Sequence, residues 1–329
     1  MGTAANIAAA VRELQAGEVV GFPTETVYGL GADATNPAAV ANIFALKGRP
    51  PDHPLIVHIA NAQALAYWAV DVPDNAYRLI EGFWPGPLTL ILKRAPHVLE
   101  AITGGQQTVG LRCPAHPVAT VLLEACGLVG IPGLAAPSAN RFGHVSPTTA
   151  AHVRAEFGPA LTLLDGGACT VGIESTIVDL STDRPRILRP GMLGEAAIAA
   201  ALQTNLSTAA DNLPRVSGSL AAHYAPRTPL EMVAPEELSS RIQELIASGL
   251  RVVAISRTES LPANVLTIPM PAAAAAYAQR LYASLRDADS IEADRIVVEA
   301  PPQDIAWRAI DDRLQRAAVG SGDWESTAP

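Results

Sequence analysis

Apolar residues recur along the chain at two spacings, and these spacings predict a protein in which helices and strands alternate. Apolar positions three and four residues apart predict helices over 6–17, 36–48, 61–70, 116–127 and 148–158. Short apolar runs between glycine, proline and asparagine predict strands over 18–24, 53–60, 86–94, 108–114, 131–140, 161–167, 175–181 and 185–191. A mixture of this kind predicts an α/β domain.

Residues that start and stop helices support these boundaries. Gly17 suits the end of the first helix, because glycine readily takes the left-handed conformation found there. Asn36 suits the cap of the second helix, and Pro37 suits its first turn. Asn61 suits the cap of the third helix.

The pattern changes near Glu195, where a short helix gives way to a stretch rich in serine, asparagine, proline and glycine. Such a composition is typical of a linker between domains. Beyond it, three strands over 230–235, 251–256 and 295–301 alternate with three helices over 236–249, 272–290 and 307–318. We predict a first domain over 1–198, a linker over 199–229 and a smaller α/β domain over 230–329.

Composition places the chain among globular proteins. About half of its 329 residues (49%) are apolar and only 17% are charged, which is ample for a buried core. The net charge of −9 argues against broad electrostatic binding of nucleic acid, which needs a basic surface. A local basic pocket for one small anion remains compatible with this charge.

Cysteine usage and hydropathy indicate a cytoplasmic protein. Cys113, Cys126 and Cys169 are odd in number and widely spaced, which predicts buried free thiols rather than disulfides or a metal site. The first residues lack the basic start and compact apolar core of a secretory leader. The most apolar run, 117–137, contains Glu124 and Pro132, so we expect a buried helix and a strand rather than a membrane span.

Polar residues that suit anion binding follow the first predicted strand and helix. Thr24, Thr26 and Tyr28 alternate, so they would share one face if the strand continued through them. The alternative is an ordinary β-branched strand edge. Lys47 and Arg49 follow at a helix end, where both can turn inward as the helix unwinds before two prolines. The alternative there is simple capping of the helix C-terminus by cations.

Other polar residues lie within or just after apolar strands. His58 lies inside one strand, where a histidine is more often structural than a ligand. Arg112 lies inside another, and a buried guanidinium needs an anion or a carboxylate as partner. Further short donors and one arginine stand at strand ends or beside helix starts: Ser138, Asn140, Ser146, Ser175, Thr176 and Arg189. Ser146 alternatively suits a helix cap.

No nucleophile with its base, acid dyad, metal spacing or G-x-S-x-G elbow is visible in the sequence. Arginine, lysine, serine, threonine and asparagine at strand ends suit the alignment of a polyanion with a small polar partner. The inventory therefore favours catalysis by positioning and charge stabilisation over a covalent intermediate.

Several segments together resemble one family. The stretches "PTETVYGLG", "KGRP", "HPLIVH", "TVGLRCPAHP", "APSAN", "GHVSPT", "VGIESTIVD" and "ILRPG" are similar to the YrdC-type domain of L-threonylcarbamoyladenylate synthases. "HYAPRTPL" and the α/β unit after it resemble the long, two-domain form of that family. The resemblance implies a twisted mixed sheet with surrounding helices and a deep cavity, followed by a smaller Rossmann-like α/β domain.

The family's reaction converts L-threonine, bicarbonate and ATP into threonylcarbamoyl-AMP and pyrophosphate. Partner proteins then transfer the threonylcarbamoyl group to an adenosine in tRNA. The resemblance thus implies a nucleotidyltransferase of tRNA modification, with magnesium accompanying ATP and no dedicated metal site. It implies no membrane contact and only indirect or weak contact with tRNA.

The resemblance also assigns roles to matching positions. L-Threonine would contact Thr26, His58, Arg112 and Ser175. The nucleotide would contact Lys47, Arg49, His53, Thr108, Ser138, Asn140, Ser146, Arg189 and Tyr224. Arg112 would hold the threonine carboxylate, while Lys47 and Arg49 would stabilise charge on the phosphates. These three residues are the catalytic candidates, and loss of Lys47 or Arg49 is expected to lower the rate about a hundredfold.

Two positions depart from the family pattern. His53 stands where the family usually carries asparagine, and the segment before "HYAP" lacks the expected Ser-Pro-Gly. The phosphate contact of His53 and the path of the linker are therefore less well defined. The linker is expected to fold over the site with Tyr224, and the second domain to position it as a lid.

Two rival functions remain at this point. A related enzyme class makes a carbamoyl-adenylate from carbamoyl phosphate, although such chains usually carry acylphosphatase-like and zinc-finger regions that this one lacks. The second rival is a protein that binds double-stranded RNA or tRNA in a basic groove, which the acidic balance disfavours.

Overall fold

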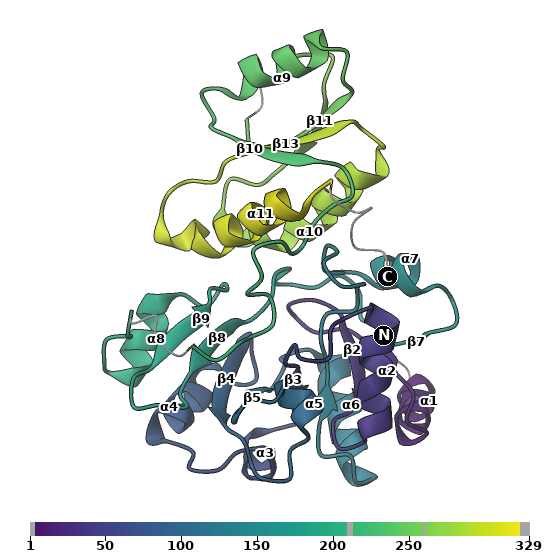
Figure 1. Cartoon of the computed structure of the whole chain (residues 1–329), viewed down its shortest axis with the longest axis vertical. Helices are drawn as coiled ribbons and strands as arrows, with labels where there is room; N and C mark the ends of the chain where they lie inside the picture. The colour runs from purple at the N-terminus through teal and green to yellow at the C-terminus, as the bar shows by residue number, and fades with distance from the viewer. Residues whose placement is uncertain (1–3, 209–212, 259–260, 323–329) are drawn as a thin grey trace. The chain divides into compact units, whose positions relative to one another are not determined.

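The computed structural model describes residues 4–208, 213–258 and 261–322. The chain forms two compact units (Figure 1). The first comprises Met1–Phe142 with Pro147–Ser219, and the second comprises Gly143–Ser146 with Leu220–Pro329. Part of the predicted linker thus folds with the first unit and part with the second. Residues 209–212 of that linker lie outside the described residues.

The first unit is built on a nine-stranded mixed sheet with the strand order β7-β1-β2-β6-β3-β5-β4-β8-β9. Its strands are β1 (Val20–Phe22), β2 (Gly29–Asp33), β3 (Ile56–His58), β4 (Leu88–Lys93), β5 (Thr108–Arg112), β6 (Leu134–Ala135), β7 (Thr162–Leu163), β8 (Thr176–Asp179) and β9 (Arg186–Arg189). The predicted mixed α/β fold is therefore confirmed for this unit.

Helices surround this sheet (Figure 1). They are α1 (Ala4–Gln15), α2 (Pro37–Lys47), η1 (Ala62–Ala64), α3 (Leu65–Trp68), α4 (Asp74–Phe83), α5 (Glu100–Thr103), α6 (Pro117–Leu128), α7 (Ala150–Phe157) and α8 (Glu195–Leu202). The Asn36 side chain caps α2, and Asn61 caps η1, as predicted. The apolar run 117–137 forms α6 and β6, as expected of a buried helix and strand. No helix in the described ranges is long and apolar enough to cross a membrane.

The segment after β1 differs from the expectation. The strand ends at Phe22 and does not continue through Thr24, Thr26 and Tyr28. Pro23 has no backbone N–H, and the Thr24 hydroxyl donates to the Val27 carbonyl oxygen at 2.6 Å, which builds a local turn. The polar residues therefore lie in the β1–β2 connection, where their direction is set by hydrogen bonds rather than by strand alternation.

Alternation along β4 separates a core face of the sheet from a polar face. Leu88, Leu90 and Leu92 are buried in the main hydrophobic core, into which α4 and α8 also pack. Thr89 and Ile91 point to the opposite face, because successive strand residues face opposite ways. Candidate site residues lie on that second face.

Strand register aligns those residues in a row. His58 of β3 pairs with Arg112 of β5, and Arg112 pairs with Thr89 of β4. Thr89 in turn pairs with Ile177 of β8, which pairs with Arg189 of β9. Residues directly opposite one another on neighbouring strands share a face. Segments that are far apart in the sequence thus present their side chains on one surface.

The second unit contains a four-stranded parallel sheet with the order β10-β13-β11-β12. Its elements are β10 (Leu230–Val233), α9 (Leu238–Ala247), β11 (Val252–Ser256), β12 (Leu266–Pro269), α10 (Ala274–Ser290), β13 (Arg295–Glu299), η2 (Ile305–Trp307) and α11 (Arg308–Gly320). Helix α9 covers one face of the sheet, and α10 and α11 cover the other (Figure 1). The sequence pattern missed β12, whose residues are mostly exposed.

All three cysteines are buried and none is in a disulfide, as predicted. Burial is the largest cause that raises the pKa of each thiol, to about 11 for Cys113 and about 12 for Cys126 and Cys169. Thiols of this kind stay protonated at neutral pH and are poor nucleophiles.

Candidate functional site

Arg112 is the centre of the candidate site. Its side chain is buried, and three of its five N–H groups have partners: Nη1 donates to the Thr26 hydroxyl at 2.8 Å, Nη2 to a Glu25 oxygen at 2.6 Å, and Nε to the Gly86 carbonyl at 3.3 Å. One N–H on each terminal nitrogen therefore has no partner among the described residues. Two parallel N–H groups on one guanidinium are the arrangement that a carboxylate accepts.

Glu25 was not among the residues predicted from the sequence. It is buried, and its second carboxylate oxygen accepts a hydrogen bond from the Ala115 backbone N–H at 3.1 Å. A buried guanidinium needs a partner of opposite charge, and Glu25 supplies it. The carboxylate is held at both oxygens, so it fixes the plane and direction of the Arg112 fork.

Thr24 and Thr26 form a short chain of hydroxyl groups beside Arg112. The Thr24 hydroxyl donates to the Val27 carbonyl, so the 2.9 Å contact between the two threonine hydroxyls must be donated by Thr26. Thr26 also accepts from Arg112. One lone pair of the Thr26 hydroxyl stays unused and can accept a hydrogen bond from a donor group of a ligand.

His58 lies in the same row as Arg112 and is buried. Burial, followed by the charge of Arg112, lowers the pKa of His58 to about 3. The imidazole is therefore neutral at physiological pH and is poorly suited to accept a proton as a general base. Its ring meets Phe22 edge-on, with ring centroids 6.0 Å apart.

Ser175, Thr89 and Arg189 form the other end of the row. The hydroxyls of Thr89 and Ser175 lie 2.7 Å apart, and Arg189 Nη2 donates to the Ser175 hydroxyl at 3.1 Å. Arg189 also donates from Nε and Nη2 to the Ser175 carbonyl oxygen, at 3.1 and 2.9 Å. Ser175 and Arg189 were predicted from the sequence, whereas Thr89 was not.

Lys47 is brought together with Ser138 and Asn140. Its ammonium is buried and donates to the carbonyl oxygens of Ser138, at 2.6 Å, and of Asn140. Burial, followed by the nearby charge of Arg49, lowers the pKa of Lys47 well below its ordinary value. Because Lys47 caps carbonyls of the loop after β6 rather than those of its own helix, simple helix capping does not explain its position.

Arg49 and His53 both contact Phe142. The guanidinium of Arg49 lies 5.8 Å from the centre of the Phe142 ring and donates from Nη2 to the Pro54 carbonyl at 3.0 Å. The His53 ring meets the same phenyl ring edge-on at 5.3 Å. Burial and then the charge of Arg49 lower the pKa of His53. An aromatic ring beside an arginine and an imidazole is a surface on which a planar base can stack.

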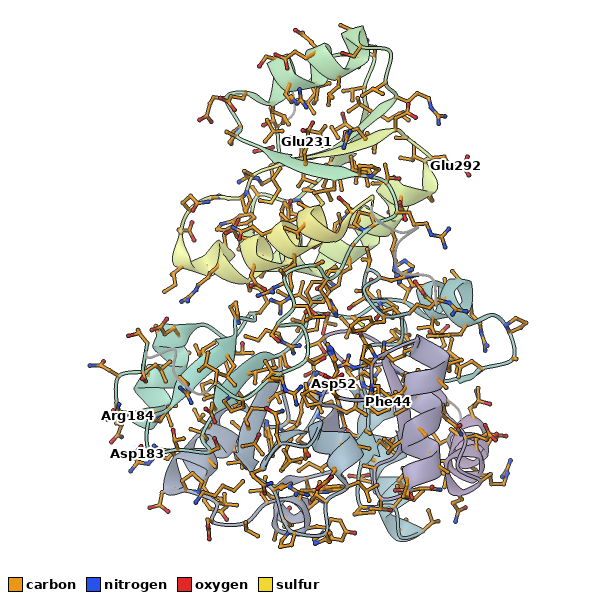
Figure 2. The ribbon with its side chains drawn as sticks, in the orientation of Figure 1. Phe44, Asp52, Asp183, Arg184, Glu231 and Glu292 are labelled. Atoms are coloured by element: carbon orange, nitrogen blue, oxygen red, sulfur yellow. The ribbon has the colours of Figure 1, made fainter. Side chains whose placement is uncertain are left out.

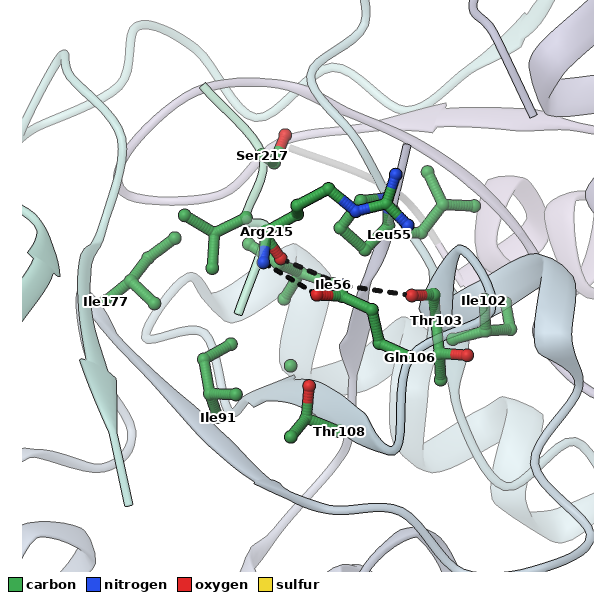
Figure 3. Close-up of a pocket in the computed structure, with 13 residues that line it drawn as sticks. Leu55, Ile56, Ile91, Ile102, Thr103, Gln106, Thr108, Ile177, Arg215 and Ser217 are labelled. Atoms are coloured by element: carbon green, nitrogen blue, oxygen red, sulfur yellow. Dashed lines mark hydrogen bonds between the residues drawn. The ribbon is translucent and has the colours of Figure 1, made fainter. Parts of the chain in front are cut away.

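Thr108 lines a hollow on the polar face of the sheet (Figure 3). The linker enters this hollow: Val216 packs against Ile91 and Ile177. The Gln106 side chain holds the linker by its backbone, because its amide accepts from the Arg215 N–H at 2.6 Å and donates to the Arg215 carbonyl at 3.1 Å. The linker segment thus lies beside a residue predicted to contact the nucleotide.

Arg215 and Arg189 fix the same linker segment through further bonds. Arg215 donates to the Gly104 carbonyl at 2.6 Å and pairs with Asp52 at 3.4 Å (Asp52 is labelled in Figure 2). Arg189 Nη1 donates to the Ser217 carbonyl at 2.9 Å. The segment is therefore tied to the first unit at both of its ends.

Two predicted nucleotide contacts, Ser146 and Tyr224, belong to the second unit. Tyr224 is buried there, stacks on Tyr282 with ring centroids 5.5 Å apart, and lies 5.4 Å from the guanidinium of Arg313. Ser146 is buried as well. Their contact with a nucleotide stays a prediction.

Two family models match the chain and together span most of it. The model described as "Telomere recombination" matches residues 12–191. The model described as "Threonylcarbamoyl-AMP synthase, C-terminal domain" matches residues 192–319.

Relatives and solved structures agree with these matches. The threonylcarbamoyl-AMP synthase of Bacillus subtilis is 39% identical over 326 residues, which cover 95% of this chain and 93% of the relative. That of Pyrococcus abyssi is 37% identical over 322 residues, covering 93% and 92%. The crystal structure of P. abyssi Sua5 complexed with L-threonine superposes with a TM-score of 0.87 at 34% identity, covering 95% of this chain and 94% of that one. The chain belongs to the threonylcarbamoyl-AMP synthase family.

Proposed function

We propose that this protein converts L-threonine, bicarbonate and ATP into threonylcarbamoyl-AMP and pyrophosphate, acting as a nucleotidyltransferase in tRNA modification. Relatives named threonylcarbamoyl-AMP synthase at 39% and 37% identity support the reaction, and the L-threonine complex of the P. abyssi protein supports the amino-acid substrate. The single observation that carries the proposal is the fork of Arg112, which keeps one N–H group on each terminal nitrogen without a partner among the described residues.

The amino acid is bound by groups on this face. Arg112 holds the carboxylate through its two open N–H groups, and Glu25 keeps the fork in place. Thr26 offers a lone pair to a proton donor of the substrate. His58, being neutral, hydrogen-bonds without adding charge. A site that offers both a cation and hydroxyl groups selects a small polar amino acid over an apolar one.

The nucleotide is bound by the cationic side of the site. Lys47, Arg49 and Arg189 spread the charge that builds on the phosphates, and Ser138 and Asn140 lie on the loop that Lys47 holds. Thr108, His53, Ser146 and Tyr224 complete the proposed set of nucleotide contacts.

Magnesium enters with ATP in this proposal. Mg²⁺ keeps several waters and binds substrate phosphates with few protein ligands. Within residues 4–208, 213–258 and 261–322, no group of three or more histidine, cysteine or acidic side chains could hold a metal ion. In the proposal the ion is carried by the nucleotide, where it would supply positive charge to the phosphates.

The reaction divides into two balanced steps. The threonine amine adds to carbon dioxide derived from bicarbonate and loses a proton, which gives a carbamate anion. A carbamate oxygen then forms a bond to the α-phosphorus of ATP while the bond from that phosphorus to the bridging oxygen breaks and pyrophosphate leaves. The attacking oxygen already carries negative charge, so this second step needs alignment and charge stabilisation rather than a strong base.

The test is an incubation of the purified protein with MgATP, bicarbonate and L-threonine, followed by mass analysis for the mixed anhydride and a pyrophosphate assay. Formation of threonylcarbamoyl-AMP supports the proposal, and L-serine in a parallel reaction measures the selectivity of the amino-acid pocket. ATP consumption that requires carbamoyl phosphate and ignores threonine would replace the proposal with carbamoyl-adenylate synthesis. Tight RNA binding with a steep salt dependence and no adduct would replace it with RNA binding.

A further inference from the structure

Thr89 is a buried polar residue in the middle of the candidate site for which neither the sequence nor the comparisons supply a role. It lies on β4, directly between Arg112 of β5 and the start of β8, and none of its surface is exposed. Its hydroxyl makes one hydrogen bond within the described part of the chain, to the Ser175 hydroxyl at 2.7 Å.

Either hydroxyl could donate this hydrogen bond, and counting protons shows what each direction leaves unpaired. A threonine hydroxyl has one proton to donate, and the buried hydroxyl of Thr89 has no second acceptor among the described residues. A buried O–H without an acceptor is destabilising by about 1–3 kcal/mol. The same cost applies to the Ser175 proton if Thr89 donates, so in either direction one of the two protons needs an acceptor on a ligand. Ser175 is the proposed L-threonine contact, so we assign the proton that faces the ligand to Ser175, and Thr89 then donates to Ser175.

The acceptor capacity of Ser175 is then used up. A hydroxyl oxygen has two lone pairs, and Ser175 accepts one hydrogen bond from Thr89 and a second from Arg189 Nη2 at 3.1 Å. Its own proton has no acceptor among the residues that the structure describes. Arg189 also fixes the Ser175 backbone through two bonds to its carbonyl oxygen, so the residue cannot easily turn away.

We propose that Thr89 is a positioning residue that makes Ser175 an obligatory hydrogen-bond donor, aimed at a carboxylate-type oxygen of the substrate. This rests on the proposed function. The oxygen belongs either to the carboxylate of L-threonine or to the carbamate formed on its amine. An ammonium group is excluded from this position, because Ser175 has no lone pair left to accept from it. Thr26 has the opposite role, because the lone pair that its hydroxyl keeps can accept a hydrogen bond from a donor group of the substrate.

Three single variants test this role. Thr89→Val keeps the shape and removes the donor, and we expect about a tenfold loss in kcat/KM for L-threonine. Thr89→Ser keeps the donor and is expected to recover most of that loss. Thr176→Val is the matched control: Thr176 is equally buried on the opposite face of β8, and its hydroxyl donates to the Leu193 carbonyl at 2.9 Å. We expect Thr176→Val to change folding stability without changing kcat/KM.

A double-mutant cycle with Ser175→Ala shows whether Thr89 acts through Ser175. In the Ser175→Ala background, adding Thr89→Val should lower kcat/KM no further. Folding stability, in contrast to kcat/KM, should change when Thr89→Val is added to Ser175→Ala. Ser175→Ala alone leaves the Thr89 proton without an acceptor, so adding Thr89→Val should restore stability that the single variant loses. An equal loss of kcat/KM from Thr89→Val in both backgrounds would overturn the proposal.

Measurements of binding and of turnover distinguish the two substrate groups whose oxygen could accept from Ser175. If the threonine carboxylate is the acceptor, Thr89→Val weakens L-threonine binding about tenfold in calorimetry without bicarbonate or ATP. If the carbamate is the acceptor, binding is unchanged and kcat falls while Thr89→Ser restores it. A Thr89→Val protein that matches Thr176→Val in both measurements would overturn the proposal. A wild-type protein that makes no adduct would instead refute the proposed function, and the calorimetric comparison alone would then decide the role of Thr89.

Discussion

The two units each contain an arginine–glutamate pair near the end of a strand, fully buried in the first unit and largely buried in the second, and the pairs differ in how far their carboxylates are saturated. In the first unit, Glu25 fixes Arg112 but leaves two N–H groups of the guanidinium available. In the second unit, the Glu299 carboxylate accepts from Ser256 at 2.6 Å and from Arg257 Nη2 at 2.7 Å. It also accepts from the backbone N–H groups of Arg257 and Thr258 and from the Thr258 hydroxyl.

The second pair is closed at its carboxylate, which accepts these five hydrogen bonds. The guanidinium of Arg257 donates again to the Ala300 carbonyl at 2.9 Å and lies 5.1 Å from the centre of the Trp307 ring. Such an arrangement joins the ends of β11 and β13 and fixes Arg257 and Thr258, the first residues after β11. The comparison teaches that burial and charge do not by themselves mark a binding site. Unused donors do not mark one either, because Arg257 bonds only through Nη2 and its buried Nε has no partner among the described residues. What distinguishes Arg112 is that its unused N–H groups lie in a row of polar side chains on one face of the sheet.

The largest effect is expected for Arg112→Lys. Lysine keeps the charge but cannot present two parallel N–H groups to a carboxylate. We expect kcat/KM for L-threonine to fall about a thousandfold, since two charge-assisted hydrogen bonds are affected. Steady-state kinetics at varied threonine measure this loss. A variant within about threefold of wild type would show that the open fork is not the carboxylate site.

A comparable change in the closed pair should act on folding and not on chemistry. Glu299→Gln removes the charge that Arg257 requires, and we expect the free energy of unfolding of the second unit to fall by about 3 kcal/mol. Urea denaturation followed by hydrogen exchange at β11 and β13 measures this change. Loss of L-threonine binding at a temperature where the variant is fully folded would contradict a purely structural role.

Glu25→Gln separates the orienting role of Glu25 from its charge. Glutamine keeps the oxygen that the Ala115 N–H contacts, but it binds the Arg112 guanidinium more weakly. We expect kcat/KM to fall about thirtyfold, with most of the change in KM for L-threonine. A larger loss in kcat than in KM would indicate that Glu25 takes part in chemistry.

Acid should destabilise the two units over different pH ranges. The folded pKa of His58 is lowered to about 3, so protonation favours the unfolded state, and stability falls as pH drops below the ordinary histidine value of 6.5. One such group predicts a loss of about 1 kcal/mol by pH 5.5. In the second unit, burial alone would raise the pKa of Glu299, but hydrogen bonds from Ser256 and the Arg257 backbone, with the charge of Arg257, lower it overall.

The contribution of Glu299 is therefore present above its ordinary value of 4.5 and is lost only as pH falls below it. Hydrogen exchange of core amides of each unit between pH 4 and pH 7 measures both effects. His58→Gln should flatten the profile of the first unit between pH 5 and pH 6.5 and leave that of the second unit unchanged. Identical profiles for both units in the wild-type protein would contradict the comparison.

Local chemistry in the sequence was enough to predict most of the elements. Asn36 and Pro37 fix the start of α2, and the apolar run 117–137 forms α6 and β6 because its glutamate and proline argue against a span. Several elements were missed for physical reasons. Helices α4 and α5 have no side-chain cap at their starts, and β12 is mostly exposed, so it shows no clean alternation.

The site was only partly visible in the sequence. Arg112 stands out because a charge inside an apolar strand demands a partner, but the sequence does not show that the partner is Glu25, 87 positions away. Thr89 is hidden for the same reason: a threonine in a strand is unremarkable until register brings it to Ser175. The predicted alternation of Thr24, Thr26 and Tyr28 failed because side-chain hydrogen bonds replaced the strand there.

The hydrogen bonds between Gln106 and the linker place little restriction on which residue can occupy position 215. The Gln106 side-chain amide bonds to the backbone N–H and C=O of Arg215 and not to its side chain, and every residue except proline has both groups. The two bonds from Gln106 are thus independent of the linker side chain at this position, whereas the contacts of Val216 and of the Arg215 guanidinium depend on the linker residues themselves. A linker that departs from the family sequence, as this one does, can keep the backbone bonds to Gln106 even where its side chains differ.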